Sequence, residues 1–277
     1  MTTTWHANQR EQGAIPYAYF VQFTRSKCAW LAFLIGVTGV VIVIVMPGGL
    51  QYFLPAKDDY PPYSPTMRKG EVFVIPANAL HPTQAVVGMR EVQKIIASFN
   101  NKSTDKLATR LQNANTVMII GPGGVPYLTD GHHAVRALLD SNQENKNVYG
   151  IVLENWSAMA PAEFWRKMVE HGDAYLFDAN HNAIDSGQLP KSVSGCTNDP
   201  YRDLAASVRL AGGYAKDFKV FYQEFIWAHY LRPLVKWDNS SDADFDRAVT
   251  EATRLAHDPA ASALPGYSAV PLAAGKF

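Results

Sequence analysis

The sequence predicts a mixed α/β domain that follows a hydrophobic N-terminal helix. Short β-branched runs alternate with helical periodicity over residues 71–153, and a longer helical pattern covers residues 154–237. Ahead of both lies an uncharged run at residues 29–46. A chain of 277 residues has room for one main domain with accessory segments.

The composition is that of a globular protein with no excess of positive charge. Hydrophobic residues make up 47% of the chain and charged residues 18%, which indicates a packed core. The 25 basic and 25 acidic residues cancel, so the basic surface typical of nucleic-acid binding is missing. Cys28 and Cys196 give no disulfide framework or Cys-based zinc site, and the histidines are not spaced as ligands on a helix, so the sequence identifies no metal site and leaves the metal requirement open.

The uncharged run AWLAFLIGVTGVVIVIVM at residues 29–46 predicts a transmembrane anchor. A helix rises 1.5 Å per residue, so this run would cross most of a hydrocarbon core of about 30 Å. Arg25 and Lys27 precede the run, which by the positive-inside rule leaves residues 1–28 in the cytoplasm and the folded domain outside. Cleavage as a signal segment, with secretion of the rest, is the alternative.

The folded domain is predicted to begin after a Pro- and Gly-rich linker at residues 47–70. Residues 71–75 form a β-branched run that ends at Pro76, as a strand does. Apolar residues between Gln84 and Phe99 fall on one helical face, and a second helix is expected over residues 104–111.

A β-hairpin and a helix start are predicted next. Residues 116–120 are a buried strand, Gly-Pro-Gly-Gly at 121–124 is the turn, and residues 125–128 return. Asp130 then stands where a helix N-terminus is expected, because apolar residues follow it with helical spacing. Residues 148–153 are a further strand.

The remainder of the chain is predicted to be mainly helical. Pro161 opens an amphipathic helix at residues 160–171, and a helical pattern at residues 201–231 is interrupted at Gly212 and Gly213. The predicted organisation is tail 1–28, anchor 29–46, linker 47–70, α/β core 71–153, helical extension 154–237, and a polar, then Ala- and Pro-rich tail 238–277 whose last residues are poorly ordered.

The residues that could carry chemistry are Asp130, Gly131, His132 and His133. A helix N-terminus favours phosphate groups through its unpaired N–H groups and its dipole. Gly131 permits close approach of a ligand, and histidines can donate hydrogen bonds or move a proton near neutral pH. The alternative is that Asp130 caps the helix and the histidines are ordinary polar residues of its first turn.

Five ordered sequence blocks resemble the ParB-like nuclease family of the ParB/sulfiredoxin superfamily. They are LHPTQAVVGMREV (80–92), IIGPGGVPYLTDGHHAVRAL (119–138), PAEFWRKMVEHG (161–172), DPYRDLAASVRLAGGYAK (199–216) and EFIWAHYLR (224–232). The resemblance covers about residues 71–232. It implies a small mixed sheet with flanking helices that sets a Gly-x-[His/Arg]-Arg helix start against nucleotide phosphates.

On that pattern Gly131 matches the glycine, His132 the variable position and His133 the basic residue that follows. Ala134 departs from the pattern, because the superfamily usually has arginine there, and Arg136 projects from a different side of a helix. Sulfiredoxin chemistry is excluded, since it needs a cysteine thiolate where His132 stands.

The resemblance also implies that the first helix brings Gln84, Arg90 and Glu91 toward the phosphate loop, although a solvated helix face would explain Arg90 and Glu91 equally well. Trp165, Trp227 and Tyr230 lie in apolar helical patterns and are predicted to be core or interface aromatics.

Two functions stay open. The first is a nuclease or other phosphoester hydrolase outside the cytoplasm, with Asp130 or His132 as general base and His133 as anion contact. Its partner would be a phosphate-bearing small molecule or nucleic acid. The second is a non-catalytic module that binds nucleotides, anions or proteins. The sequence identifies no cofactor and no oligomeric state.

Overall fold

The computed structural model describes residues 60–114, 116–238 and 241–274, together with the backbone of four strands within residues 19–53. The chain divides into two units, Met1–Asp59 and Tyr60–Phe277, and each is described by itself. The last residues, 275–277, for which poor order was predicted, lie outside the described part.

The first unit contains an antiparallel four-stranded sheet in place of the predicted helix. Its strands are β1 (Tyr19–Val21), β2 (Trp30–Gly36), β3 (Gly39–Met46) and β4 (Gly49–Phe53). The prediction of a single helix over residues 29–46 is therefore wrong for the residues that form β2 and β3. The run is rich in Val and Ile, which favour strands, and β2 pairs with β3 so that Gly36 stands opposite Gly39. Among the described residues, no helix is both long and apolar enough to span a membrane.

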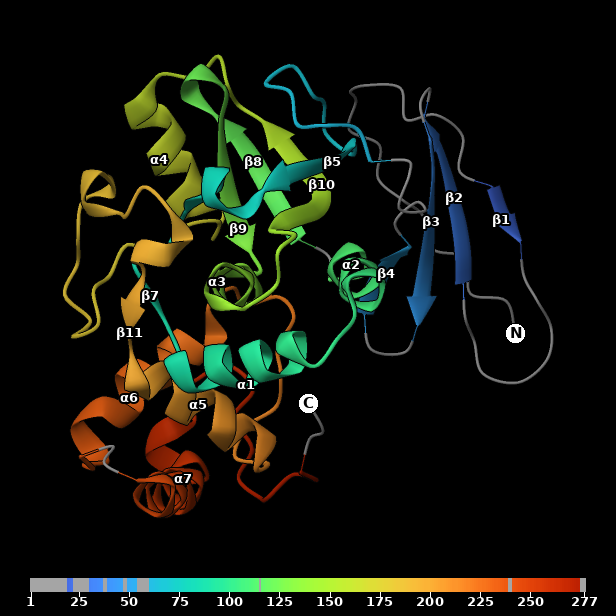
Figure 1. Ribbon diagram of the computed structural model, residues 1–277. Coiled ribbons are helices and arrows are strands. Elements are labelled where there is room, and N and C mark those ends of the chain that lie inside the picture. The colour runs from blue at the N-terminus through green and yellow to red at the C-terminus, as the bar shows by residue number, and fades with distance from the viewer. Residues whose placement is uncertain are drawn as a thin grey trace, which may run out of the picture. The chain divides into compact units, whose positions relative to one another are not determined.

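The second unit is built on a five-stranded mixed sheet with the strand order β5-β10-β8-β9-β6 (Figure 1). Its strands are β5 (Val72–Pro76), β6 (His81–Pro82), β8 (Thr116–Gly121), β9 (Val125–Asp130) and β10 (Asn147–Asn155). The predicted hairpin is confirmed, because β8 and β9 pair antiparallel across the short helix η3 (Pro122–Gly124). Strands β8 and β10 pair in parallel, as do β9 and β6.

Helix α4 (Pro161–Glu170) covers one face of this sheet (Figure 1). It begins with Pro161, as predicted, since proline is favoured in the first turn of a helix. Phe164 and Met168 are fully buried with Ile119 of β8, and Tyr127 and Trp165 pack against them. Successive strand residues point to opposite faces, so Leu128 is buried on the face away from Tyr127.

Three further helices follow the expected order. They are α1 (Met89–Asn100), α2 (Thr104–Gln112) and α3 (His132–Asp140). Helix α1 begins five residues later than the predicted apolar face, because residues before it are extended. Within that segment β7 (Val86–Val87) pairs in parallel with β11 (Thr197–Asn198). The pairing ties the start of α1 to the C-terminal half of the unit.

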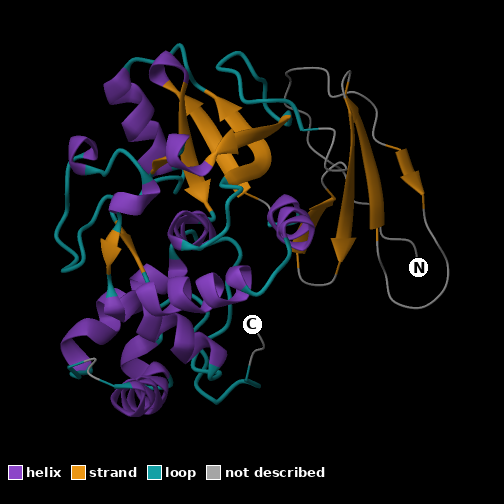
Figure 2. Cartoon of the chain, viewed as in Figure 1, coloured by secondary structure: helices purple, strands orange, loops and turns teal. Residues whose placement is uncertain are grey.

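The C-terminal half is a helical layer with a hydrophobic core of its own (Figure 2). Its helices are α5 (Pro200–Leu210), α6 (Gln223–Leu234) and α7 (Asp242–Ala256). Trp227 is fully buried there, stacked on Tyr214 with ring centroids 4.2 Å apart, which confirms it as a core aromatic. The polar segment that begins at residue 238 contains α7, whose Phe245 and Ala252 are buried in this core.

Candidate functional site

The predicted helix start is present at the end of β9. Asp130 is the last residue of that strand, Gly131 is the N-cap of α3, and the helix begins at His132. Gly131 has φ +93°, a left-handed conformation that glycine adopts without strain. Its N–H donates to Asp130 Oδ1 at 2.7 Å, and no side chain caps the first turn of α3.

His132 is buried and serves as a hydrogen-bond acceptor. Its Nε2 accepts the backbone N–H of Thr83 at 3.1 Å, in the segment that follows β6. Burial, together with the neighbouring His133, lowers the pKa of His132 to about 3, so the ring is neutral. The bond occupies the lone pair that a general base would use, and it fixes the position of the chain at Thr83.

His133 repeats this arrangement one residue later. Its Nε2 accepts the backbone N–H of Gly88 at 3.0 Å, just before α1 begins. Burial, and secondarily the charge of Arg202, lowers the pKa of His133 well below its usual value. Both histidines of the motif therefore hold the segment between β6 and α1 against the start of α3.

The N-terminus of α1 is occupied by a carboxylate of the chain itself. Asp203 of α5 accepts the backbone N–H of Arg90 at 2.8 Å and that of Glu91 at 3.0 Å. Asp203 is 4% exposed, so its two oxygens fill the anion site that a helix start offers. A side chain at Gly88 would clash with this carboxylate, which explains the glycine there.

The predicted ligand-binding residues are not all brought together. Arg90 points to α7, where its guanidinium donates to Asp242 Oδ1 at 2.6 Å and lies 4.3 Å from the centre of the Phe245 ring. Gln84 is buried and donates to the carbonyl of Val86 at 2.6 Å. Only Glu91 lies beside the motif, with Oε2 4.0 Å from His133 Nε2.

Glu91 connects the motif to a cluster of charged side chains around the buried Glu224 of α6. Arg202 donates to Glu91 Oε2 at 2.5 Å, and Glu224 accepts from Lys216 at 3.1 Å and pairs with Arg209 at 3.0 Å. Burial alone would raise the pKa of Glu224, but Arg202 and Lys216 outweigh it and the pKa is lowered. Glu224 is therefore a carboxylate at neutral pH.

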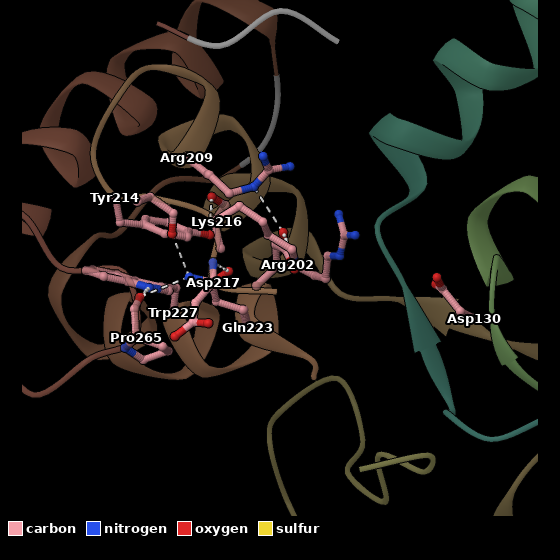
Figure 3. A network of polar contacts seen from close by, with 12 residues as sticks. Asp130, Arg202, Arg209, Tyr214, Lys216, Asp217, Gln223, Trp227 and Pro265 are labelled. Carbon is pink, nitrogen blue, oxygen red and sulfur yellow. Dashed lines mark hydrogen bonds and ion pairs between the residues drawn. The ribbon is translucent and has the colours of Figure 1, made fainter. Parts of the chain in front are cut away.

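Asp130 lies opposite this charged cluster (Figure 3). The protein packed around it raises the pKa of its carboxyl, even though part of the side chain reaches solvent, and Lys216 and Arg202 oppose the shift. The Nε atom of Arg202 is buried and has no hydrogen-bond partner. The Asp130 carboxyl at the helix start and the Arg202 guanidinium therefore lie in the same region.

Tyr222 adds a hydroxyl to the same region. It adopts φ +55°, which is uncommon for a residue other than glycine, and its hydroxyl lies 3.5 Å from Thr83 Oγ1. Burial raises the pKa of Tyr222, and the charges of Asp173 and Asp130 raise it further. Within the described ranges, no group of three His, Cys, Asp or Glu side chains is placed to hold a metal ion.

A five-stranded mixed sheet with flanking helices, and a glycine-capped helix start at its edge, define a mixed α/β domain. The family described as "Putative ParB-like nuclease" matches residues 74–233, and the chain belongs to this family. The crystal structure of protein Atu1540 from Agrobacterium tumefaciens is similar, with 34% identity and a TM-score of 0.65. The match covers 73% of this chain and 98% of that one. Among curated proteins, none matches.

Arg202 and Asp203 were not predicted as site residues. Both lie in the block 199–216, but they reach the motif only because α5 packs against α1. One sequence signal could have identified the pair: Arg202 and Asp203 are adjacent charged residues in a helical pattern with an apolar face. Charged side chains that are buried need partners, so such a pair indicates a polar contact with another element.

Proposed function

We propose that this chain binds a phosphate ester between the start of α3 and Arg202, and hydrolyses it with Asp130 as general base. The proposal rests on one observation: the Asp130 carboxyl, whose pKa is raised, lies at an uncapped helix start where the charge of Arg202 acts on it. A carboxylate with a raised pKa is suited to accept a proton near neutral pH. The guanidinium and the helix dipole would stabilise the phosphate charge.

Asp130 is the better candidate for the base than His132. The His132 lone pair already accepts the Thr83 N–H, and the low pKa of the ring makes it a weak base. His133 is engaged in the same way with Gly88. In this proposal the two histidines position the helix start, while Asp130 and Arg202 contact the ligand.

The test measures hydrolysis of bis(p-nitrophenyl) phosphate and of a single-stranded DNA oligonucleotide by the full chain. Asp130→Asn should lower kcat by about 10²- to 10⁴-fold and leave KM nearly unchanged, as loss of a general base does. Arg202→Lys keeps the charge but loses the fork of donors, so it should raise KM. Asp140→Asn, at the far end of the same helix, is the control and should change neither.

The second function, a non-catalytic binding module, is favoured by the engagement of both histidines with the backbone. A binding module predicts that the wild-type chain shows no turnover. It also predicts that calorimetry detects phosphate binding, and that Arg202→Lys weakens this binding. Absence of both turnover and phosphate binding would overturn the site itself. The location of the domain outside the cytoplasm rested on the N-terminal helix and stays a prediction, which cell fractionation would test.

A further inference from the structure

A cavity of about 230 Å³ opens at the edge of the sheet, beside the short strand β6. Its walls come from β6, β9, α4 and the loop 186–191, and the residues that matter for the argument are His81, Tyr127, Trp165, Ser186 and Lys191. His81 stands opposite Tyr127 in the sheet, with ring centroids 5.7 Å apart. The Tyr127 and Trp165 rings meet edge to face at 5.2 Å.

The polar groups of this cavity are open to a ligand. In the described part of the chain, the side chains of His81, Tyr127, Trp165 and Lys191 have no hydrogen bond or ion pair with another residue. Each can donate a hydrogen bond. No Asp or Glu lines the cavity, and the nearby Asp185 carboxylate is engaged as the N-cap of η4 (Ser186–Gln188).

We propose that this cavity binds a small organic anion with a single aromatic ring. The ring would lie against Trp165 and Tyr127, and the anionic group, a carboxylate or a phosphate, would contact Lys191 and His81. Aromatic walls favour a flat apolar group, and unpaired donors without a neighbouring carboxylate favour negative charge. Sites for drug-sized ligands typically have about 300–1,000 Å³, so the smaller volume suits a one-ring compound.

This site is independent of the proposed phosphoester site. No residue that lines the cavity belongs to the network of Asp130, His133 and Arg202. Tyr127 and Trp165 pack on the α4 face of the sheet, in the core cluster of Phe164. Failure of one site in an experiment therefore does not imply failure of the other.

The test is calorimetric titration of the full chain with benzoate, phenol, acetate and phenyl phosphate, the last in an excess of inorganic phosphate that occupies the proposed phosphoester site. Benzoate or phenyl phosphate should bind at least about tenfold more tightly than phenol, which lacks the charge, or acetate, which lacks the ring. A preference between the two anions identifies the anionic group. Equal binding of phenol would overturn the role of charge, and equal binding of acetate would overturn the role of the ring.

Two substitutions locate the binding. Lys191→Met and Trp165→Leu should each weaken the preferred anion by about tenfold, whereas Lys219→Met, at another exposed lysine, should leave the affinity unchanged. Circular dichroism checks that the variants fold. If Trp165→Leu does not fold, Lys191→Met still tests the proposal, because Lys191 is an exposed residue. Asp130→Asn should also leave the affinity unchanged. Binding of neither anion, or an affinity equal to that of the wild-type chain in both cavity variants, would overturn the proposal.

Discussion

The motif at the start of α3 and the cavity beside β6 use the same residue types for different purposes. His132 and His133 are buried and accept backbone N–H groups, so their polar atoms stabilise the fold. His81 lies in a cavity and has no such partner among the described residues. The comparison shows that a histidine within a recognisable motif can be structural, while an inconspicuous one elsewhere keeps its donors available for a ligand.

The largest expected difference between the two regions is in stability. His132→Ala leaves the Thr83 N–H buried without an acceptor and opens a cavity, so the free energy of unfolding should fall by about 3 kcal/mol. His81→Ala, the matched substitution in the cavity, should change it by less than about 0.5 kcal/mol. Urea unfolding followed by circular dichroism measures both. Equal losses would show that the two histidines do not differ in role.

The second difference concerns pH. The pKa of His132 is about 3 in the folded chain, against a usual value of 6.5, so the unfolded chain binds its proton first as pH falls. The stability that neutral His132 contributes is fully present above pH 6.5 and is lost between pH 6.5 and 3, at about 1.4 kcal/mol per pH unit. His133, whose pKa is also lowered, acts in the same direction.

Urea unfolding at pH 6.5 and at pH 5.0, in the wild-type chain and in a variant without His132, would measure this dependence. The free energy of unfolding should fall by about 2 kcal/mol through His132 over this interval, and His133 should add to the fall. In His132→Leu, the fall in the free energy of unfolding between pH 6.5 and pH 5.0 should be smaller by the amount that His132 contributes. An unchanged dependence in that variant would mean that His132 is not the titrating group.

A third test asks whether the start of α3 can bind an anion as readily as the cavity. Ala134→Arg restores the guanidinium that the superfamily usually carries there, and a bidentate contact should tighten inorganic phosphate binding by about tenfold. Arg136, which donates to Asp140 at 2.6 Å, is on the same helix, and Arg136→Lys serves as the control. Phosphate calorimetry that finds no gain in Ala134→Arg would count against the helix start as a ligand site.

The smallest expected effect is the pH dependence of binding in the cavity. Burial and the nearby Lys191 lower the pKa of His81 in the free protein, and a bound anion would raise it. Binding therefore takes up a proton, and the affinity for the preferred aromatic anion should rise about threefold from pH 7.5 to pH 6.0. Benzoate calorimetry at both values tests this, because benzoate keeps its charge over this range, and His81→Asn should bind it without the pH dependence.

The sequence was most informative where local chemistry decides the structure. Gly-Pro-Gly-Gly at residues 121–124 predicted the hairpin turn, and Gly131 needs its positive φ whatever packs around it. Helix α3 therefore begins where the pattern indicated. The same logic failed at residues 29–46, because an uncharged run of this length satisfies the criterion for a helix while its Val and Ile content also suits paired strands.

Contacts between distant segments could not be predicted in the same way. Arg90 pairs with Asp242, and Glu91 with Arg202, across more than a hundred residues. The cavity takes its side chains from positions 81, 127, 165 and 191, so no spacing in the sequence marks it. Sequence patterns identify elements and their ends, whereas the partners of a charged side chain depend on how those elements pack.

The hydrogen bond from Thr83 to His132 joins helix α3 to the edge of the sheet. Thr83 follows directly after β6, so the same bond that secures the motif also anchors the strand that carries His81. Protonation of His132 would remove the acceptor of this bond, because both ring nitrogens of a charged histidine are donors. The attachment of the short edge strand therefore depends on the protonation state of a residue in another element.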